Sequence, residues 1–211
     1  RRQALGDLAA EGIPIPREPV RAALAALDAR TRREAIVAIA RIGDGLEAPL
    51  LLPLAADSDP IVGHTAIEAL VSLSQQAAPV ESAVIAACNA ALDASTTSAA
   101  IHRAASRVLG ELHTLAASEA VIARLAAAHD PARRADLVWA AARQFRRESV
   151  WKGDSWGTRP DTRGPYYSAE EWDASPQVLA ALLVAMKNAR GAELPALDHT
   201  LGLHRIKAEH V

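Results

Sequence analysis

The sequence has few aromatic residues, a single cysteine and no excess of basic charge. Its 211 residues include one phenylalanine, two tyrosines and four tryptophans, with a formal net charge of −2. Cys88 has no partner for an internal disulfide, and its place in an apolar helical run predicts a buried small residue. Nucleic-acid-binding modules carry a basic surface, so we expect no nucleic acid partner. No apolar run has the length of a membrane span, so direct insertion is not expected.

Sequence motifs for catalysis and for cofactor binding are also lacking. There is no Cys-x-x-Cys-His haem attachment motif, no Gly-x-Ser-x-Gly, no phosphate-binding loop and no dinucleotide fingerprint. The seven histidines lack the spacing of a zinc-binding helix, so we predict that they are solvated or cap helices: His64, His102, His113, His129, His199, His204 and His210. We therefore predict no catalytic residue, no metal site and no cofactor, and do not expect this chain to be an enzyme.

Alanine dominates what is present. Half of the residues are hydrophobic, which is enough for a substantial core. Alanine is the best helix former and adds little volume, so it favours helices that approach one another closely. The composition therefore predicts an all-α fold.

Four similar segments recur along the chain, at residues 33–43, 63–73, 101–112 and 133–143. Alignment of Ala35, Ala66, Ala105 and Ala135 gives steps of 31, 39 and 30 residues, which suit repeats of paired helices. We expect these alanines at contacts between helices. Partner helices are predicted at residues 17–27, 46–56, 79–92 and 117–128, where apolar residues have helical spacing.

Aspartate or serine followed by proline is the predicted start of three helices. Asp59 precedes Pro60, Asp130 precedes Pro131, and Ser175 is followed by Pro176, a pattern typical of a capping residue before the first helical turn. The pattern divides the chain into helical repeats over 1–146, a loop over 147–175, and C-terminal helices over 176–211 that form a truncated repeat. Because the chain starts at Arg1 in mid-pattern, we expect it to be a segment of a longer protein.

The segment Asp59–Leu70 resembles the second helix of a HEAT repeat, with its Asp-Pro start and its Ala-x-x-Ala-Leu core. This resemblance implies an α-α superhelix, a HEAT-like solenoid in which each helix pair packs on its neighbours.

All seven aromatic residues lie between Trp139 and Trp172, and most lie on one segment rich in proline and glycine, residues 151–172. Tryptophan and tyrosine rings there provide large flat surfaces, and the charged residues suit ion pairs or recognition of a carboxylate or hydroxyl-rich ligand. We expect this segment to be ordered and to pack on the helix from Pro131 and the helix from Pro176. The candidate binding or docking residues are Trp151, Trp156, Arg159, Asp161, Arg163, Tyr166, Tyr167 and Trp172.

Three roles are open for the aromatic segment. It could be a structural plug or docking element, a loop that lines a ligand site of a neighbouring domain, or an independent active site. The first is favoured, because the segment lacks any catalytic motif.

The stretch Trp156-Gly-Thr-Arg-Pro-Asp-Thr-Arg-Gly-Pro-Tyr-Tyr167, with Trp172 a few residues on, closely resembles a signature of large bacterial membrane-bound dehydrogenase-like proteins, also called PVC-type haem-binding proteins. In that family the signature lies in a HEAT-repeat region, between a β-propeller and a c-type cytochrome domain. The resemblance implies a periplasmic or cell-envelope location. It also implies that the partners of this chain are those neighbouring domains, or another protein.

These observations lead to one expectation and one alternative. We expect a non-catalytic HEAT-repeat scaffold within a larger oxidoreductase-like multidomain protein. The alternative is that the aromatic segment forms part of a carbohydrate or polyol site serving a neighbouring catalytic domain.

Overall fold

The computed structural model describes residues 16–150 and 168–207, and most of them are helical. The all-α class predicted from the sequence is therefore confirmed. The described residues form two compact units, one up to Val108 and one from Leu109 onward. Within these ranges, every helix is too short or too polar to pass through a lipid bilayer.

The first unit consists of short, sequentially packed helices. They are α2 (Arg17–Leu24), α3 (Ala29–Ile42), the 3-10 turn η1 (Gly45–Glu47), α4 (Ala48–Leu51), the 3-10 turn η2 (Leu52–Ala56), α5 (Pro60–Ser74), α6 (Ala78–Asp93) and most of α7 (Ala99–Glu111). The predicted helix at 46–56 is divided, with Pro49 and Pro53 near the starts of α4 and η2. Proline lacks the N–H that a continuous helix needs, which explains the division.

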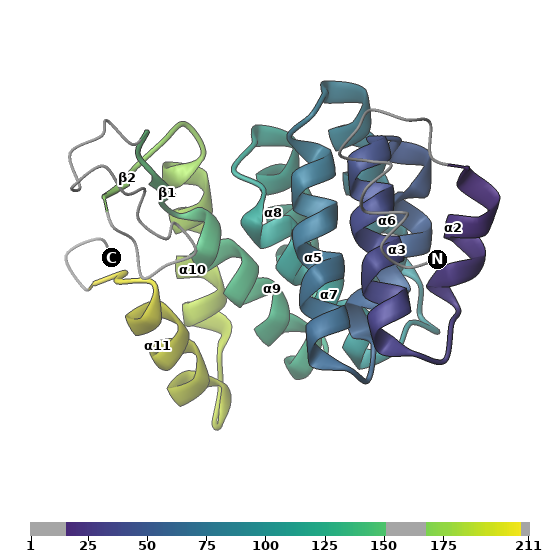
Figure 1. Ribbon diagram of the computed structural model, residues 1–211. Helices are drawn as coiled ribbons and strands as arrows, with labels where there is room; N and C mark the ends of the chain where they lie inside the picture. Colours follow the sequence, from purple (N-terminus) through teal and green to yellow (C-terminus); the bar gives the residue numbers. More distant parts are fainter. Residues whose placement is uncertain (1–15, 151–167, 208–211) are drawn as a thin grey trace. The chain divides into compact units, whose positions relative to one another are not determined.

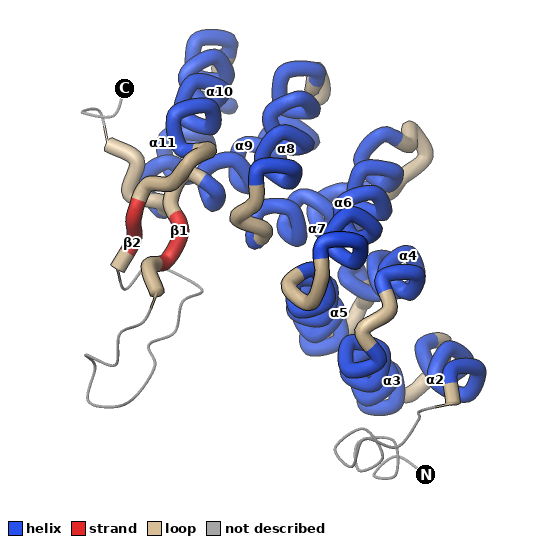
Figure 2. The backbone as a smooth tube through the Cα atoms, turned by 90° about the horizontal axis from the view of Figure 1, so that it is seen from above, coloured by secondary structure: helices blue, strands red, loops and turns tan. Residues whose placement is uncertain are grey.

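The second unit surrounds α9 (Pro131–Gln144), which packs against α8 (Leu115–Ala127), α10 (Ser175–Asn188) and α11 (Glu193–Leu203) (Figure 1). Two short strands, β1 (Arg147–Glu148) and β2 (Ala169–Glu170), pair antiparallel and lie side by side (Figure 2). We call this pair the ribbon. The sequence did not predict it, because strands of two residues have no hydrophobic alternation to detect.

Of the three predicted helix starts that contain proline, two have the predicted aspartate as N-cap. Asp59 accepts hydrogen bonds from the backbone N–H of Ile61 and Val62, and Asp130 accepts one from Arg133 at 2.8 Å. The prediction for Ser175 was wrong. Ala174 precedes α10 instead, and the Ser175 hydroxyl is used in a tertiary hydrogen bond described below.

Small residues fill the contacts between helices, with one change of register. Three of the aligned alanines are fully buried: Ala35, Ala66 and Ala105. Ala135 is exposed, so its predicted place at a helix contact was wrong. The three buried alanines lie seven residues after the residue that precedes their helix, and the position seven residues after Asp130 is Leu137, which is buried. The segment at 133–143 therefore matches the other three when it is aligned on Asp130, the residue before its helix, rather than on Ala135.

An arginine four residues after the cap has the same role in α3 and α9. Arg32 donates to the carbonyl two residues before its cap at 2.9 Å and forms an ion pair with Asp57 at 2.7 Å. Arg134 donates to the equivalent carbonyl at 3.5 Å and forms an ion pair with Glu193. Each arginine thus links the start of its helix to the acid of a later element in the same unit.

Candidate functional site

Most of the candidate docking residues fall in the part of the chain that the structure does not describe. These are Trp151, Trp156, Arg159, Asp161, Arg163, Tyr166 and Tyr167. Trp172 is described, as are the residues on both sides of 151–167. The site is therefore built here from its flanks, which show how the two ends of the aromatic segment are held.

The ribbon brings the two flanks together. Arg147 is opposite Glu170 in the antiparallel register, and their side chains form an ion pair at 3.0 Å. Beyond the strands, the backbone N–H of Ser149 donates to the carbonyl of Ser168 at 2.9 Å. The chain therefore leaves and re-enters the described structure at one place.

Side chains from the second flank bind the end of α9. The last carbonyls of an α-helix have no partner within the helix and need donors from elsewhere. The indole N–H of Trp172 donates to the carbonyl of Gln144 at 2.7 Å, and the hydroxyl of Ser175 donates to the carbonyl of Phe145 at 2.6 Å. The Ser175 oxygen also accepts the backbone N–H of Trp172 at 2.8 Å. This part of the predicted packing, between Trp172 and α9, is confirmed.

His113, in the loop between α7 and α8, binds the same helix end from another direction. Its Nε2 lies 2.9 Å from the carbonyl oxygen of Arg146 and 3.2 Å from that of Arg143. Its Nδ1 lies 3.2 Å from the carbonyl oxygen of Glu111, the last residue of α7. The ring also meets Trp172 edge to face, with 6.0 Å between the ring centroids. His113 therefore contacts both the end of α9 and the flank of the aromatic segment.

Gln144 completes this arrangement from inside the core. It is fully buried, and its Nε2 donates to the carbonyls of Leu109 at 2.7 Å and Leu112 at 3.2 Å. The end of α9 is thereby linked to the end of α7. We refer to His113, Gln144, Trp172 and Ser175 together as the root cluster, because they fix the base from which the aromatic segment extends.

A partly buried ion pair lies beside the root cluster. The Arg143 guanidinium, 7% exposed, pairs with the Glu111 carboxylate at 2.9 Å. Burial lowers the pKa of His113, and the positive charge of Arg143 acts in the same direction. His204, buried with its ring edge-on to Trp139, has its pKa lowered to about 4 by burial and by the same charge. Both imidazoles are therefore neutral near pH 7, next to a permanent cation.

The histidine prediction from the sequence is correct in part. His64, His129 and His199 are exposed, and His113 does cap helix ends through backbone carbonyls. His102 is buried within α7, so the expectation of a solvated or capping residue was wrong for it, whereas His204 is buried but occupies the C-cap position of α11. His113 and its acceptors on α9 are about thirty residues apart, and no local pattern connects residues so distant in sequence.

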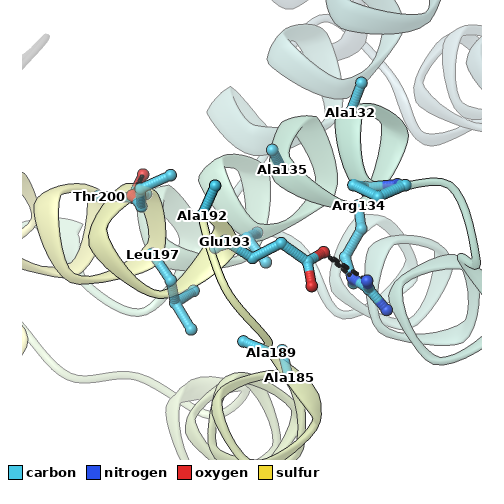
Figure 3. Close-up of a pocket in the computed structure, with 12 residues that line it drawn as sticks. Ala132, Arg134, Ala135, Ala185, Ala189, Ala192, Glu193, Leu197 and Thr200 are labelled. Carbon is cyan, nitrogen blue, oxygen red and sulfur yellow. Dashed lines mark hydrogen bonds and ion pairs between the residues drawn. The ribbon is translucent and has the colours of Figure 1, made fainter.

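A pocket of about 280 Å³ lies between α9, α10 and α11 (Figure 3). Half of its lining residues are alanine, and the Arg134–Glu193 ion pair borders it. The guanidinium of Arg134 lowers the pKa of Glu193, so the pair is charged on both sides. Small side chains on α9 leave room for the pocket. Ala132 and Ala135 lie two and five residues after the cap of α9, whereas the equivalent positions of α3 are arginines.

A second, wider groove of about 790 Å³ lies between α8 and α10. Ile122 and Val184 contribute to its apolar wall, and Glu119 and Gln177 are among its few polar residues. Neither hollow is lined by tryptophan, tyrosine or phenylalanine, so neither has the large flat surface on which sugar rings stack.

Metal chemistry has no donor set in the described residues. Over 16–150 and 168–207, no three side chains among histidine, cysteine, aspartate and glutamate are grouped closely enough to hold an ion. Cys88 is buried, as predicted from its apolar run. The root cluster contacts the backbone carbonyls at the end of α9, and the ribbon joins the residues on either side of 151–167.

Comparison with known proteins adds little to this geometry. No protein-family model matches the sequence, and no curated protein matches it either. Among solved structures, the chain is similar to a crystal structure of an engineered protein, with 14% identity and a TM-score of 0.40 over 97% of this chain and 84% of that one. A similarity this low supports no conclusion about function.

Proposed function

We propose that this chain is a non-catalytic helical-repeat scaffold whose second unit holds the aromatic segment for docking against another domain. The observation that carries the proposal is the root cluster. The side chain of Trp172, the last residue of the segment, and that of Ser175, just after it, donate hydrogen bonds to the backbone that precedes the segment, at Gln144 and Phe145. A loop that only connected two helices would need no such attachment, whereas a docking element gains affinity when its ends are fixed in advance.

A HEAT-like solenoid is part of the proposal. It is supported by the repeated aspartate caps and by the equivalent roles of Arg32 and Arg134, each bound to the carbonyl two residues before its cap. Repeats of this kind commonly serve as extended binding surfaces. The resemblance of residues 156–167 to dehydrogenase-like proteins supplies the rest: a larger, oxidoreductase-like parent in the cell envelope, with a propeller and a c-type cytochrome as the partners.

Binding of a polyol by the aromatic segment is the second candidate. Trp172 gives it little support, because its indole N–H is donated to the backbone and its ring meets His113. This candidate therefore depends on Trp156 and Tyr166.

The test is a titration between separately purified domains. The propeller and cytochrome domains that the resemblance implies for the parent protein are titrated with this chain by calorimetry. We expect one of them to bind, and expect replacement of both Arg159 and Arg163 by alanine to weaken binding. Arg30→Ala, an exposed arginine of the first unit, is the control and should bind normally.

Two outcomes would contradict the scaffold proposal. One is the absence of binding to either domain. The other is saturable binding of mono- or oligosaccharides that Trp156→Ala or Tyr166→Ala abolishes, which would favour the polyol site instead.

A further inference from the structure

We propose that the pocket between α9, α10 and α11 binds a small neutral amphiphile, a short aliphatic chain that carries one uncharged polar group such as a hydroxyl. We call it the alanine pocket, because half of its lining residues are alanine. It lies along the first half of α9, whereas the root cluster lies at the end of that helix. The two sites are therefore separate, and a ligand of the alanine pocket would serve a function beyond docking of the aromatic segment.

The alanine pocket is elongated, because it follows one face of each of two helices. On α11 this face has Glu193, Leu197 and Thr200, and on α9 it has Arg134 and Val138. Glu193 and Thr200 are seven residues apart, which corresponds to about 10 Å along the helix axis. In Figure 3, Arg134 and Thr200 lie at opposite ends of the pocket. This shape suits an extended chain better than a compact ring.

Size and lining also favour an aliphatic ligand. The volume is about 280 Å³, whereas an apolar cavity of about 150 Å³ is enough for benzene. Four buried apolar residues line the pocket: Val138, Ala185, Ala189 and Leu197. A water molecule needs about two to four polar partners, which hydrocarbon side chains do not provide. Replacement of such water by an aliphatic chain is therefore favourable.

The polar end of the pocket is electrically neutral. Nε and Nη2 of Arg134 donate to one carboxylate oxygen of Glu193, and Nη1 lies 3.5 Å from the carbonyl oxygen of Ala128. Each of the two Nη atoms carries a second N–H, which can donate to an oxygen of a ligand. At the other end, the hydroxyl of Thr200 already donates to the carbonyl of Ala196. The polar group of the ligand is therefore expected beside Arg134.

Charge decides which polar group fits there. Both side chains of the Arg134–Glu193 pair are less than a quarter exposed, at 22% and 24%, so solvent screens them only in part. A carboxylate on the ligand would lie close to the Glu193 carboxylate, and an ammonium group would lie close to the Arg134 guanidinium. Like charges at such a distance repel one another, so an uncharged group is favoured.

Alanine on α9 keeps the pocket open. The start of α3 has the same aspartate cap and the same paired arginine, but Arg30 and Arg33 occupy the positions of Ala132 and Ala135. A long side chain at either position of α9 would extend into the pocket or across it. These two alanines are therefore the residues to change in a test of binding.

The experiment titrates the purified chain with 1-hexanol, hexanoate and hexylammonium, and follows the methyl resonances of the protein by NMR. We expect saturable binding of 1-hexanol, with intermolecular NOEs from its chain to the methyl groups of Val138 and Leu197. We expect at least about tenfold weaker binding of the two charged probes, because each brings a charge beside the like-charged member of the ion pair.

Two variants and a matched control test the location of the site. Ala135→Leu and Ala132→Leu place a larger side chain in the pocket and should abolish saturable binding of 1-hexanol. Ala116→Leu makes the same change at an exposed position on the first turn of α8, outside the pocket, and should bind 1-hexanol as the wild type does.

Several results would overturn the proposal. They are the absence of saturable 1-hexanol binding, NOEs to Ile122 and Val184 of the groove between α8 and α10 in place of Val138 and Leu197, and unchanged affinity in a folded Ala135→Leu variant. Hexanoate or hexylammonium binding as tightly as 1-hexanol would refute a site for a neutral ligand. If the leucine variants do not fold, the NOEs of the wild type decide the question. None of these measurements uses a partner domain, so their outcome is independent of the docking titration.

Discussion

His204 offers a direct test of how the second unit handles buried charge. It follows α11 with 9% of its surface exposed, and its ring meets Trp139 nearly perpendicularly at 5.7 Å. Burial, followed by the charge of Arg143, lowers its pKa from 6.5 to about 4. The perturbation is His204→Asn, which has no titration in this range.

The sign and size of the effect follow from the two pKa values. The unfolded chain binds a proton at His204 below about pH 6.5, whereas the folded chain does not until about pH 4. The stabilisation is therefore present in full above pH 6.5 and is lost as the pH falls toward 4. A difference of this size corresponds to about 3 kcal/mol, because one pKa unit is about 1.4 kcal/mol.

The variant separates this effect from other titrations. At pH 7, His204→Asn should be less stable by about 1 kcal/mol, since the ring contact with Trp139 is lost. Between pH 7 and about pH 4.5, the free energy of unfolding of the variant should rise relative to that of the wild type by about 2 to 3 kcal/mol. Only the wild type loses stability through protonation of His204 over this range.

Urea unfolding followed by tryptophan fluorescence provides the assay. All four tryptophans lie between Trp139 and Trp172, so the signal reports the second unit alone. A difference in the free energy of unfolding that stays constant from pH 7 to pH 4.5 would refute the reasoning, because it would mean that His204 titrates equally in both states.

Three further outcomes are expected. Ala66→Leu should destabilise the first unit by about 1–3 kcal/mol in thermal unfolding followed by circular dichroism, because Ala66 is fully buried on α5, while Ala22→Leu at an exposed site should have little effect. Gly110→Ala should destabilise the second unit in the fluorescence assay, since a Cβ would lie 3.0 Å from the Trp139 ring; Gly202→Ala, with open space around it, should not. Finally, the purified chain should show no Soret band after haem reconstitution and no dye reduction with sugars or alcohols, and either signal would contradict a non-catalytic role.

The sequence was sufficient for the all-α class and for most helix positions, the divided helix at 46–56 excepted, because these depend on local properties. Alanine content, apolar spacing and aspartate caps act within a few residues, as the starts of α5 and α9 show. Of the predicted packing of residues 151–172, the contact of Trp172 with α9 is confirmed by its indole hydrogen bond to Gln144. It failed where a local rule competed with a distant partner: Ser175 was predicted as a cap, but its hydroxyl bonds the carbonyl of Phe145.

Tertiary structure alone decided the root cluster and the pocket. His113 and Gln144 meet carbonyls about thirty residues away, and the ribbon pairs two strands too short to have a pattern. The exposure of Ala135 likewise depends on how α9 is positioned against α10 and α11, since alanine suits a close contact and an open wall equally well. Local sequence determines which residues become helical, but the partners of backbone groups at helix ends depend on packing between segments far apart in the chain.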